Sequence, residues 1–291
     1  MSTVYESDLI IDPKKFSYVV NRLRTFFLSR GFVEVHTQNR LSILAACEDV
    51  DNITPFTYGA LNYPLPQTGQ MWLEYHMLRE PDVPGYFCVS TSYRNEANPV
   101  PGRHDVIFPM FEFELPGNME TLIELERELL TYLGYNIGDS RRVTYDAMAQ
   151  EYETDDLTHE EEQRMYREMG PVVFLTNFPE STSPFWNMSR ASDGTAAKID
   201  VILSGMETIG SAQRSSDPVE MRRLFETIKD GSYADKLYRT FGNERVNGEL
   251  NAFLRLPFIE RSGGGIGLTR LIRSMEKEGL LGGVASPRDA K

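Results

Sequence analysis

Five residues that could bind a nucleotide lie close together in the stretch 91–115, TSYRNEANPVPGRHDVIFPMFEFEL. They are Arg94, Glu96, Arg103, His104 and Phe108. Guanidinium groups bind phosphate oxygens through two parallel hydrogen bonds, and an aromatic ring or an arginine plane stacks on a base. Two arginines, a histidine and an aromatic residue on one hairpin are therefore what a bound nucleotide needs. The alternative is a solvated hairpin with scattered charges.

A second group of charged residues follows later in the chain. Asp200 and Glu207 are seven residues apart, across a predicted strand and a turn at Gly205, and Arg214 follows seven residues after Glu207. Two carboxylates near triphosphate oxygens suit Mg²⁺, which takes few protein oxygens and keeps water and phosphate ligands. The alternative is a pair of strand carboxylates in contact with solvent.

A glycine-rich run near the C-terminal end is the third candidate. Residues 261–270 read RSGGGIGLTR and are followed by a predicted helix. Glycines let a backbone approach a ligand closely, although a run of glycines alone also fits a tight turn.

The first candidate site requires a hairpin to carry it. Residues 86–94 and 108–115 alternate between apolar and polar side chains, and Pro99, Pro101 and Gly102 lie between them. This pattern predicts a long antiparallel hairpin.

A helix and a strand are predicted before this hairpin. Asp12 is a suitable N-cap, and Pro13 suits the first helical position. Apolar residues recur at helical spacing up to Arg30, Gly31 ends the helix, and residues 32–37 alternate as a strand.

Four further segments have clear local patterns. We predict a helix over 71–79, an amphipathic helix over 121–135 that ends at Gly134, and a strand over 171–177. Residues 151–169 and 221–242 are rich in charge and predict surface helices.

Together these stretches resemble the three motifs of the class II aminoacyl-tRNA synthetases, most closely the aspartyl and asparaginyl enzymes. Residues 93–96, 103–104, 108 and 111–114 match motif 2, and residues 261–270 match motif 3. The first helix and strand resemble motif 1, which builds the dimer interface in the family, although Gln38 replaces the family's proline. The resemblance covers nearly all of residues 12–288. It implies an α+β fold, a class II synthetase core with an antiparallel β-sheet flanked by helices, and a homodimer.

The resemblance also implies an ATP site with Mg²⁺. Arg94 would hold the α-phosphate and the activated carboxylate, Glu96 would face the adenine amino group, and Phe108 would stack on adenine. Arg103 and His104 would reach the outer phosphates.

Motif 3 and the carboxylate pair would complete this site. Arg270 would sandwich adenine and touch the γ-phosphate, and Asp200 with Glu207 would hold Mg-ATP. Gly210 stands where the family often has a serine oxygen ligand. Thr269 stands where synthetases usually have glutamate, whereas ammonia-dependent asparagine synthetases have a similarly small residue there.

Four residues would bind the amino acid in the family pattern. Glu48 would meet the substrate ammonium, unless residues 42–56 are simply an acidic surface loop. Gln67 and Gln70 would line the pocket, and Arg214 would contact a side-chain carboxylate or amide oxygen. Leu73 replaces the lysine of the aspartate-specific members, and this puts free aspartate as the substrate in doubt.

Composition narrows the class of partner. The net charge is −13, and no cluster of lysine and arginine exceeds two residues, which disfavours tRNA because nucleic-acid binding usually leaves a basic face. Two cysteines make a disulfide framework or a zinc site improbable and indicate a reducing cytoplasm. No stretch approaches the roughly 18–20 apolar residues of a membrane span.

The sequence therefore predicts a single catalytic domain over residues 12–291 after a leader of residues 1–11, without the anticodon-binding domain of the aspartyl and asparaginyl synthetases. The leading hypothesis is an ATP-dependent, AMP-forming ligase that transfers an activated aspartate- or asparagine-like amino acid to ammonia or another small amine, as asparagine synthetase A does. One alternative is a synthetase paralogue that aminoacylates tRNA, a protein or a carrier. Another is a catalytically silent regulator that binds ATP or an amino acid.

Overall fold

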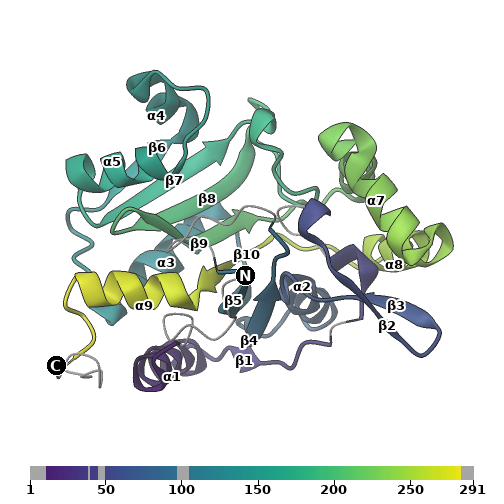
Figure 1. Ribbon diagram of the computed structural model, residues 1–291, viewed down its shortest axis with the longest axis horizontal. Helices are drawn as coiled ribbons and strands as arrows, with labels where there is room; N and C mark the ends of the chain where they lie inside the picture. Colours follow the sequence, from purple (N-terminus) through teal and green to yellow (C-terminus); the bar gives the residue numbers. More distant parts are fainter. Residues whose placement is uncertain (1–10, 39, 45–49, 97–104, 283–291) are drawn as a thin grey trace, which may run out of the picture.

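The computed structural model of the protein describes residues 11–38, 40–44, 50–96 and 105–282. Within these residues, one large sheet has the strand order β1-β4-β5-β10-β9-β8-β7-β6 (Figure 1). In this order the strands are β1 (Val33–Glu34), β4 (Tyr86–Tyr93), β5 (Ile107–Pro116), β10 (Arg261–Gly267), β9 (Met206–Gln213), β8 (Ala196–Leu203), β7 (Val172–Phe178) and β6 (Arg141–Thr144).

The pairing of these strands is mostly antiparallel. Every neighbouring pair from β4 to β8 and the pair β7–β8 is antiparallel, whereas the outermost pairs β1–β4 and β6–β7 are parallel. The strands β2 (Pro55–Tyr58) and β3 (Leu61–Pro64) form a separate hairpin. The expected α+β architecture, an antiparallel sheet flanked by helices, is confirmed.

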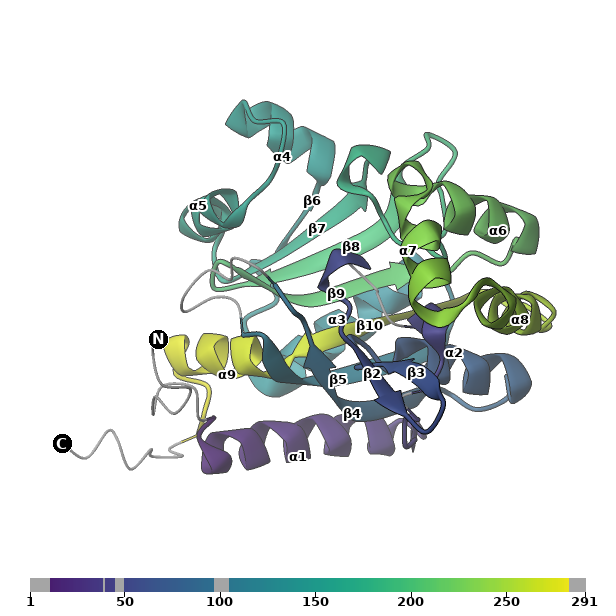
Figure 2. The ribbon, with the colours of Figure 1, turned by 45° about the vertical axis from the view of Figure 1, so that its right-hand side comes forward.

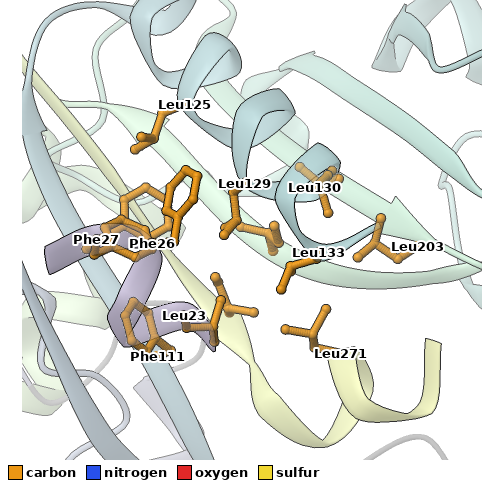
Figure 3. Close-up of a cluster of buried hydrophobic side chains, with 14 of the residues drawn as sticks. Leu23, Phe26, Phe27, Phe111, Leu125, Leu129, Leu130, Leu133, Leu203 and Leu271 are labelled. Atoms are coloured by element: carbon orange, nitrogen blue, oxygen red, sulfur yellow. The ribbon is translucent and has the colours of Figure 1, made fainter. Parts of the chain in front are cut away.

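Three helices cover one face of the sheet. They are α1 (Pro13–Ser29), α3 (Met119–Leu133) and α9 (Leu268–Lys277), and Figures 1 and 2 show α1 and α9 running along the same side. Their apolar side chains pack on inward-facing residues of the central strands, and Figure 3 shows Phe27 beside Phe111 and Leu133 near Leu271. Each fully buried leucine or phenylalanine of this kind contributes roughly 1.5–3 kcal/mol to folding.

The other helices cover the opposite face and one end of the sheet. Helices α4 (Tyr145–Tyr152) and α5 (His159–Met169) enclose a cluster with Val173 and Leu175, whose neighbours along β7 face α3. Helices α2 (Gln70–Arg79), α6 (Pro218–Thr227), α7 (Ser232–Phe241) and α8 (Asn243–Leu254) contribute to a further core around Trp186, and Figure 2 shows α6, α7 and α8 grouped together.

Local signals account for most of these elements. The Asp12 carboxylate accepts hydrogen bonds from the backbone nitrogens of Lys14 and Lys15 at 2.9 and 3.1 Å, and the helix then runs to Ser29 as predicted. Helix α3 ends at Gly134, where φ is +107°, a conformation that glycine adopts without strain. The predicted hairpin forms with Tyr86 opposite Glu114.

Three predicted elements differ from the structure. The surface helix expected over 151–169 is divided between two helices, because α4 ends at Tyr152 and α5 begins at His159. The expected strand over 32–37 is paired only at Val33 and Glu34, which lie opposite Tyr86 and Phe87 at the edge of the sheet. The helix expected over 221–242 is interrupted at Lys229 and Asp230, whose φ angles are +50° and +54°. No helix in the described ranges is both long and apolar enough to cross a membrane.

Candidate active site

A cavity of about 350 Å³ lies on the central strands, on the face away from α1, α3 and α9. The alternation of residues along the strands shows which face this is. Met110 and Glu112 of β5 line the cavity, whereas Phe111 between them belongs to the core under α1. Helix α2 and the segment 182–188 form further walls.

Most of the residues that the sequence singled out meet in this cavity. The described lining residues include Gln67, Gln70, Arg94, Glu96, Phe108, Glu207, Arg214 and Arg270. Their functional roles remain predictions. Glu48, Arg103 and His104 lie outside the described residues. Asp200 lies just below the cavity surface, with 8% of its area exposed.

The predicted nucleotide side of the cavity is built by the β4–β5 hairpin. Phe108 lies opposite Ser92 in the strand pairing, so its ring stands beside the end of β4. The guanidinium carbon of Arg94 lies 5.2 Å from the centre of the Phe108 ring. The backbone nitrogen of Arg94 donates to Val106 O at 2.8 Å, which fixes this end of the hairpin. The pair presents a cation and a flat ring to the same space.

Arg270 reaches the cavity from the first turn of α9. Its Nη1 donates to the backbone oxygen of Glu207 at 2.8 Å and lies 3.6 Å from the Glu207 carboxylate. Because Glu207 lies on β9, this contact joins the start of α9 to the carboxylate that was predicted to hold Mg²⁺.

The two predicted metal-binding carboxylates flank Gly210. A Cβ atom at Gly210 would lie 3.3 Å from Glu207 Oε1 and 3.8 Å from Asp200 Oδ1. Lys198, which was not among the predicted site residues, lines the cavity and places Nζ 2.9 Å from Asp200 Oδ2. Lys198 and Asp200 are two residues apart on β8, and this period-two spacing on a predicted strand is the signal that could have found the pair.

Mg²⁺ fits part of this arrangement. Carboxylate oxygens are its usual protein ligands, and Glu207 lies beside the cavity with 31% of its side chain exposed. The described residues hold no cluster of three or more histidine, cysteine, aspartate or glutamate side chains that could bind a metal alone. An ion here would therefore draw most of its ligands from phosphate and water.

Glu112 holds together the opposite end of the cavity. It lies in the motif 2 match but was not among the predicted site residues. Its carboxylate accepts hydrogen bonds from the Gly69 backbone nitrogen at 2.9 and 3.0 Å, from Ser90 Oγ at 2.5 Å and from the Thr68 hydroxyl. A negative charge at this position also favours the N-terminus of α2, which begins at Gln70. Glu112 thereby positions the segment that carries both predicted glutamines.

Below this end of the cavity lies a buried network of four charged side chains: Glu74, Glu114, Arg214 and Arg261. Arg261 Nη2 lies 2.6 Å from Glu74 Oε2, and Arg214 Nη2 lies 3.3 Å from Glu114 Oε2. Gln70 Nε2 donates to Glu114 at 2.5 Å. Burial raises the pKa of Glu114 to about 7, and the charge of Arg214 opposes this rise. The network holds the Arg214 guanidinium at the cavity wall.

The glycine-rich strand makes room for protein side chains as well as for a ligand. A side chain at Gly263 would collide with Glu114, and one at Gly264 would collide with Ser211. Gly264, Gly265 and Gly267 line the cavity. A side chain at Gly265 would collide with Met110, whereas the backbone at Gly267 has more space around it.

The family model described as tRNA synthetases class II (D, K and N) matches residues 12–280. The chain belongs to this family. Its members are ATP-dependent ligases that use ATP with Mg²⁺. The predicted resemblance is therefore confirmed.

Individual relatives agree with the family assignment. The chain is 24% identical over 277 residues to an aspartate–tRNA(Asp) ligase of Thermoplasma volcanium, covering 86% of this chain and 61% of the relative. It is 24% identical over 225 residues to an aspartate–tRNA(Asp/Asn) ligase of Methanopyrus kandleri, covering 67% of this chain and 51% of the relative.

Solved structures show the same fold. The asparaginyl-tRNA synthetase of Pyrococcus horikoshii complexed with asparaginyl-adenylate superposes with a TM-score of 0.75 at 19% identity, over 91% of this chain and 64% of that chain. The corresponding Entamoeba histolytica enzyme gives 0.74 at 18% identity, over 93% of this chain and 63% of that chain. The chain thus spans only part of each of these proteins.

Proposed function

We propose that the protein is an AMP-forming ligase that activates an aspartate- or asparagine-like amino acid as an acyl-adenylate and transfers it to ammonia or another small amine. The observation that carries this proposal is the single cavity that joins two sets of residues. Arg94, Phe108 and Arg270 line its nucleotide side, and Gln70 and Arg214 line the side predicted for the amino acid.

The first step requires orientation and charge stabilisation rather than a protein nucleophile. A carboxylate oxygen of the amino acid attacks the α-phosphorus of ATP, and the bond to pyrophosphate breaks. The carboxylate is already deprotonated at neutral pH, so no general base is needed. Arg94 would bind the α-phosphate and the incoming carboxylate, while Arg270 would contact the γ-phosphate and stack on adenine. Bound Mg²⁺, held by Glu207, would add positive charge beside the phosphates.

In the second step, the lone pair of a neutral amine attacks the adenylate carbonyl. The C–N bond forms, AMP leaves with the electrons of the C–O bond, and the surplus proton of the nitrogen passes to water. Orientation in the cavity is again the main requirement, because the adenylate is already a reactive mixed anhydride.

Transfer to tRNA, a protein or a carrier is the second candidate. It is favoured by the relatives, which are aspartate–tRNA ligases and asparaginyl-tRNA synthetases. The net charge of −13 opposes it, because an RNA partner is normally bound through a basic surface.

We propose further that two copies of the chain pair through the first helix and the edge strand. Leu28 of α1 and Val33 of β1 are 53% and 44% exposed, and β1 is the outer strand of the sheet. Light scattering is expected to give the mass of two chains, and Val33→Asp is expected to give the mass of one. A single-chain mass for the wild type would contradict this assembly.

A reducing cytoplasm is the proposed compartment.

Release of AMP with different acceptors tests the proposed reaction. The chain is incubated with ATP, Mg²⁺ and each amino acid in turn, first alone, then with ammonium, and then with total tRNA. Ammonium-dependent AMP and a new amide product are expected for one amino acid. AMP release that needs tRNA would favour the second candidate, and ATP binding without AMP or pyrophosphate release in any mixture would indicate a silent regulator.

A further inference from the structure

A lysine of β8 lies beside the carboxylate pair that was predicted to bind metal. Lys198 Nζ is 2.9 Å from Asp200 Oδ2, and 25% of the Lys198 side chain is exposed. Lys198 is one of the lining residues of the cavity, whereas Asp200 is not among those that the structure describes there. A ligand in the cavity would therefore contact the Lys198 ammonium group before the Asp200 carboxylate.

The two carboxylates differ in their access to the cavity. Asp200 lies opposite Gly210 in the strand pairing and is 8% exposed. Glu207 lies on the other side of Gly210, lines the cavity and keeps 31% of its side chain exposed. Of these two carboxylates, the one that lines the cavity is that of Glu207.

The position of the Lys198 ammonium is fixed from two directions. Asp200 holds it at hydrogen-bonding distance, and Nζ also lies 4.1 Å from the centre of the Phe178 ring. Carboxylates and aromatic faces both attract ammonium groups, and the attraction strengthens when water is excluded. A nearly buried carboxylate requires a compensating positive charge, and Lys198 supplies it for Asp200.

A divalent cation at Asp200 would have to displace this ammonium or lie next to it. If the cation displaced the ammonium, Lys198 would lose its contact with the Asp200 carboxylate. If the cation lay beside the ammonium, two positive charges of the cation and one of Lys198 would lie within a few ångströms of one another. Both arrangements are unfavourable compared with the ion pair in the structure. A divalent cation at Glu207 faces a weaker competitor, because Arg270 Nη1 lies 3.6 Å from the Glu207 carboxylate and donates its 2.8 Å hydrogen bond to the Glu207 backbone oxygen.

We propose that Lys198 acts as a built-in replacement for a divalent cation at Asp200, so that Glu207 is the carboxylate that meets the metal of Mg-ATP. This inference rests on the proposed function, because it assumes that ATP binds in the cavity. It also narrows the expectation from sequence that both carboxylates are metal ligands. Lys198 is a positioning residue in this arrangement, since it acts through Asp200.

Mn²⁺ binding measures the arrangement without any need for turnover. The number and affinity of bound Mn²⁺ ions are determined by electron paramagnetic resonance in the presence of a non-hydrolysable ATP analogue, for the wild type and five variants. Asp200→Asn is expected to keep the wild-type number of ions. Lys198→Met is expected to gain about one ion per chain, because it leaves a carboxylate without its ammonium.

The remaining variants control for structural effects. Lys198→Arg keeps the positive charge and is expected to match the wild type, and the double variant Lys198→Met with Asp200→Asn is expected to lose the additional ion. Glu207→Gln is expected to weaken Mn²⁺ binding at least about tenfold. Loss of an ion in Asp200→Asn, or an unchanged number in Lys198→Met, would overturn the inference. Failure of the wild type to bind the nucleotide analogue would instead overturn the proposed function on which it rests.

Discussion

Arg261 Nη2 lies 2.6 Å from Glu74 Oε2, and both side chains are almost completely shielded from solvent. The pair connects α2 to β10, two elements that are far apart in the sequence. The other oxygen of the same carboxylate lies 3.8 Å from Arg214 Nε. The side chain predicted to bind the amino acid is therefore held in place by charges beneath the cavity.

Glu74→Gln tests how much this buried pair contributes to the free energy of unfolding. Removing one partner leaves Arg261 charged and buried, which typically costs about 3–5 kcal/mol of unfolding free energy. Urea denaturation measures the loss. Glu120→Gln is the matched control, because Glu120 pairs with Arg142 at 2.8 Å at the surface and its loss is expected to cost less than about 1 kcal/mol. Equal losses in the two variants would show that burial does not govern this pair.

Glu126 of α3 is a buried acid whose contribution to the stability of the fold depends on pH. Burial raises its pKa from 4.5 to about 8, and the charge of Asp200 adds to the rise. Between about pH 4.5 and 8 the folded state therefore binds this proton more tightly than the unfolded state, so the contribution of Glu126 to stability falls as pH rises. Glu126→Gln is expected to match the wild type near pH 4.5 and to exceed it in melting temperature above pH 8.

The control for this titration lies on the same helix. Glu124 is exposed on α3, and Glu124→Gln is expected to leave the pH dependence of the melting temperature as it is in the wild type. Parallel melting profiles for the wild type and Glu126→Gln over this range would show that Glu126 does not titrate as described.

Arg94→Lys tests the geometry of the nucleotide side. Lysine keeps the charge but not the planar fork that binds phosphate and carboxylate oxygens together, nor the stacking on Phe108. We expect kcat/KM for amino-acid-dependent pyrophosphate exchange to fall about 100-fold. Arg239→Lys, at a side chain that is 81% exposed on α7, is expected to change nothing. Comparable rates in the two variants would remove Arg94 from the site.

Leu73→Lys tests why aspartate is a doubtful substrate. Leu73 is completely buried in a cluster with Cys88, whose sulfur lies 3.7 Å from Glu112 Oε2. Leu73 is not among the described lining residues of the cavity, so a lysine there would have to extend past Cys88 toward Glu112 to bring a positive charge to the amino-acid end. We expect the preference for aspartate over asparagine to rise about tenfold, with some loss of stability. Leu73→Met has a similar volume without the charge and is expected to keep the wild-type preference. An equal shift in both variants would attribute the change to packing.

Local patterns in the sequence predicted the elements that local chemistry determines. The cap at Asp12, the hairpin of β4 and β5 and the end of α3 at Gly134 each depend on residues that are near one another in the chain. Local patterns did not predict which strands pair with one another in the sheet. The short strand β1 depends on a single neighbour, β4, which no local pattern identifies.

The site shows the same division. Residues such as Arg94 and Arg270 were predicted from the resemblance of their stretches to the family motifs, and both line the cavity. The link between Glu74 and Arg261 joins residues 187 positions apart, so spacing could not reveal it. Lys198 belongs to no family motif, although it lies two residues before Asp200 on the same face of β8.

Amino-acid-dependent exchange of labelled pyrophosphate into ATP measures adenylate formation directly, without knowledge of the acceptor. The panel consists of the standard amino acids with β-alanine and related acids, each tested with the wild type and with Arg94→Lys. Exchange supported by one amino acid, and lost in the variant, is the result that a cavity lined by Arg94, Arg214 and Arg270 predicts. Nucleotide binding without exchange for any acid in the panel would contradict the assignment of this protein as an adenylate-forming ligase.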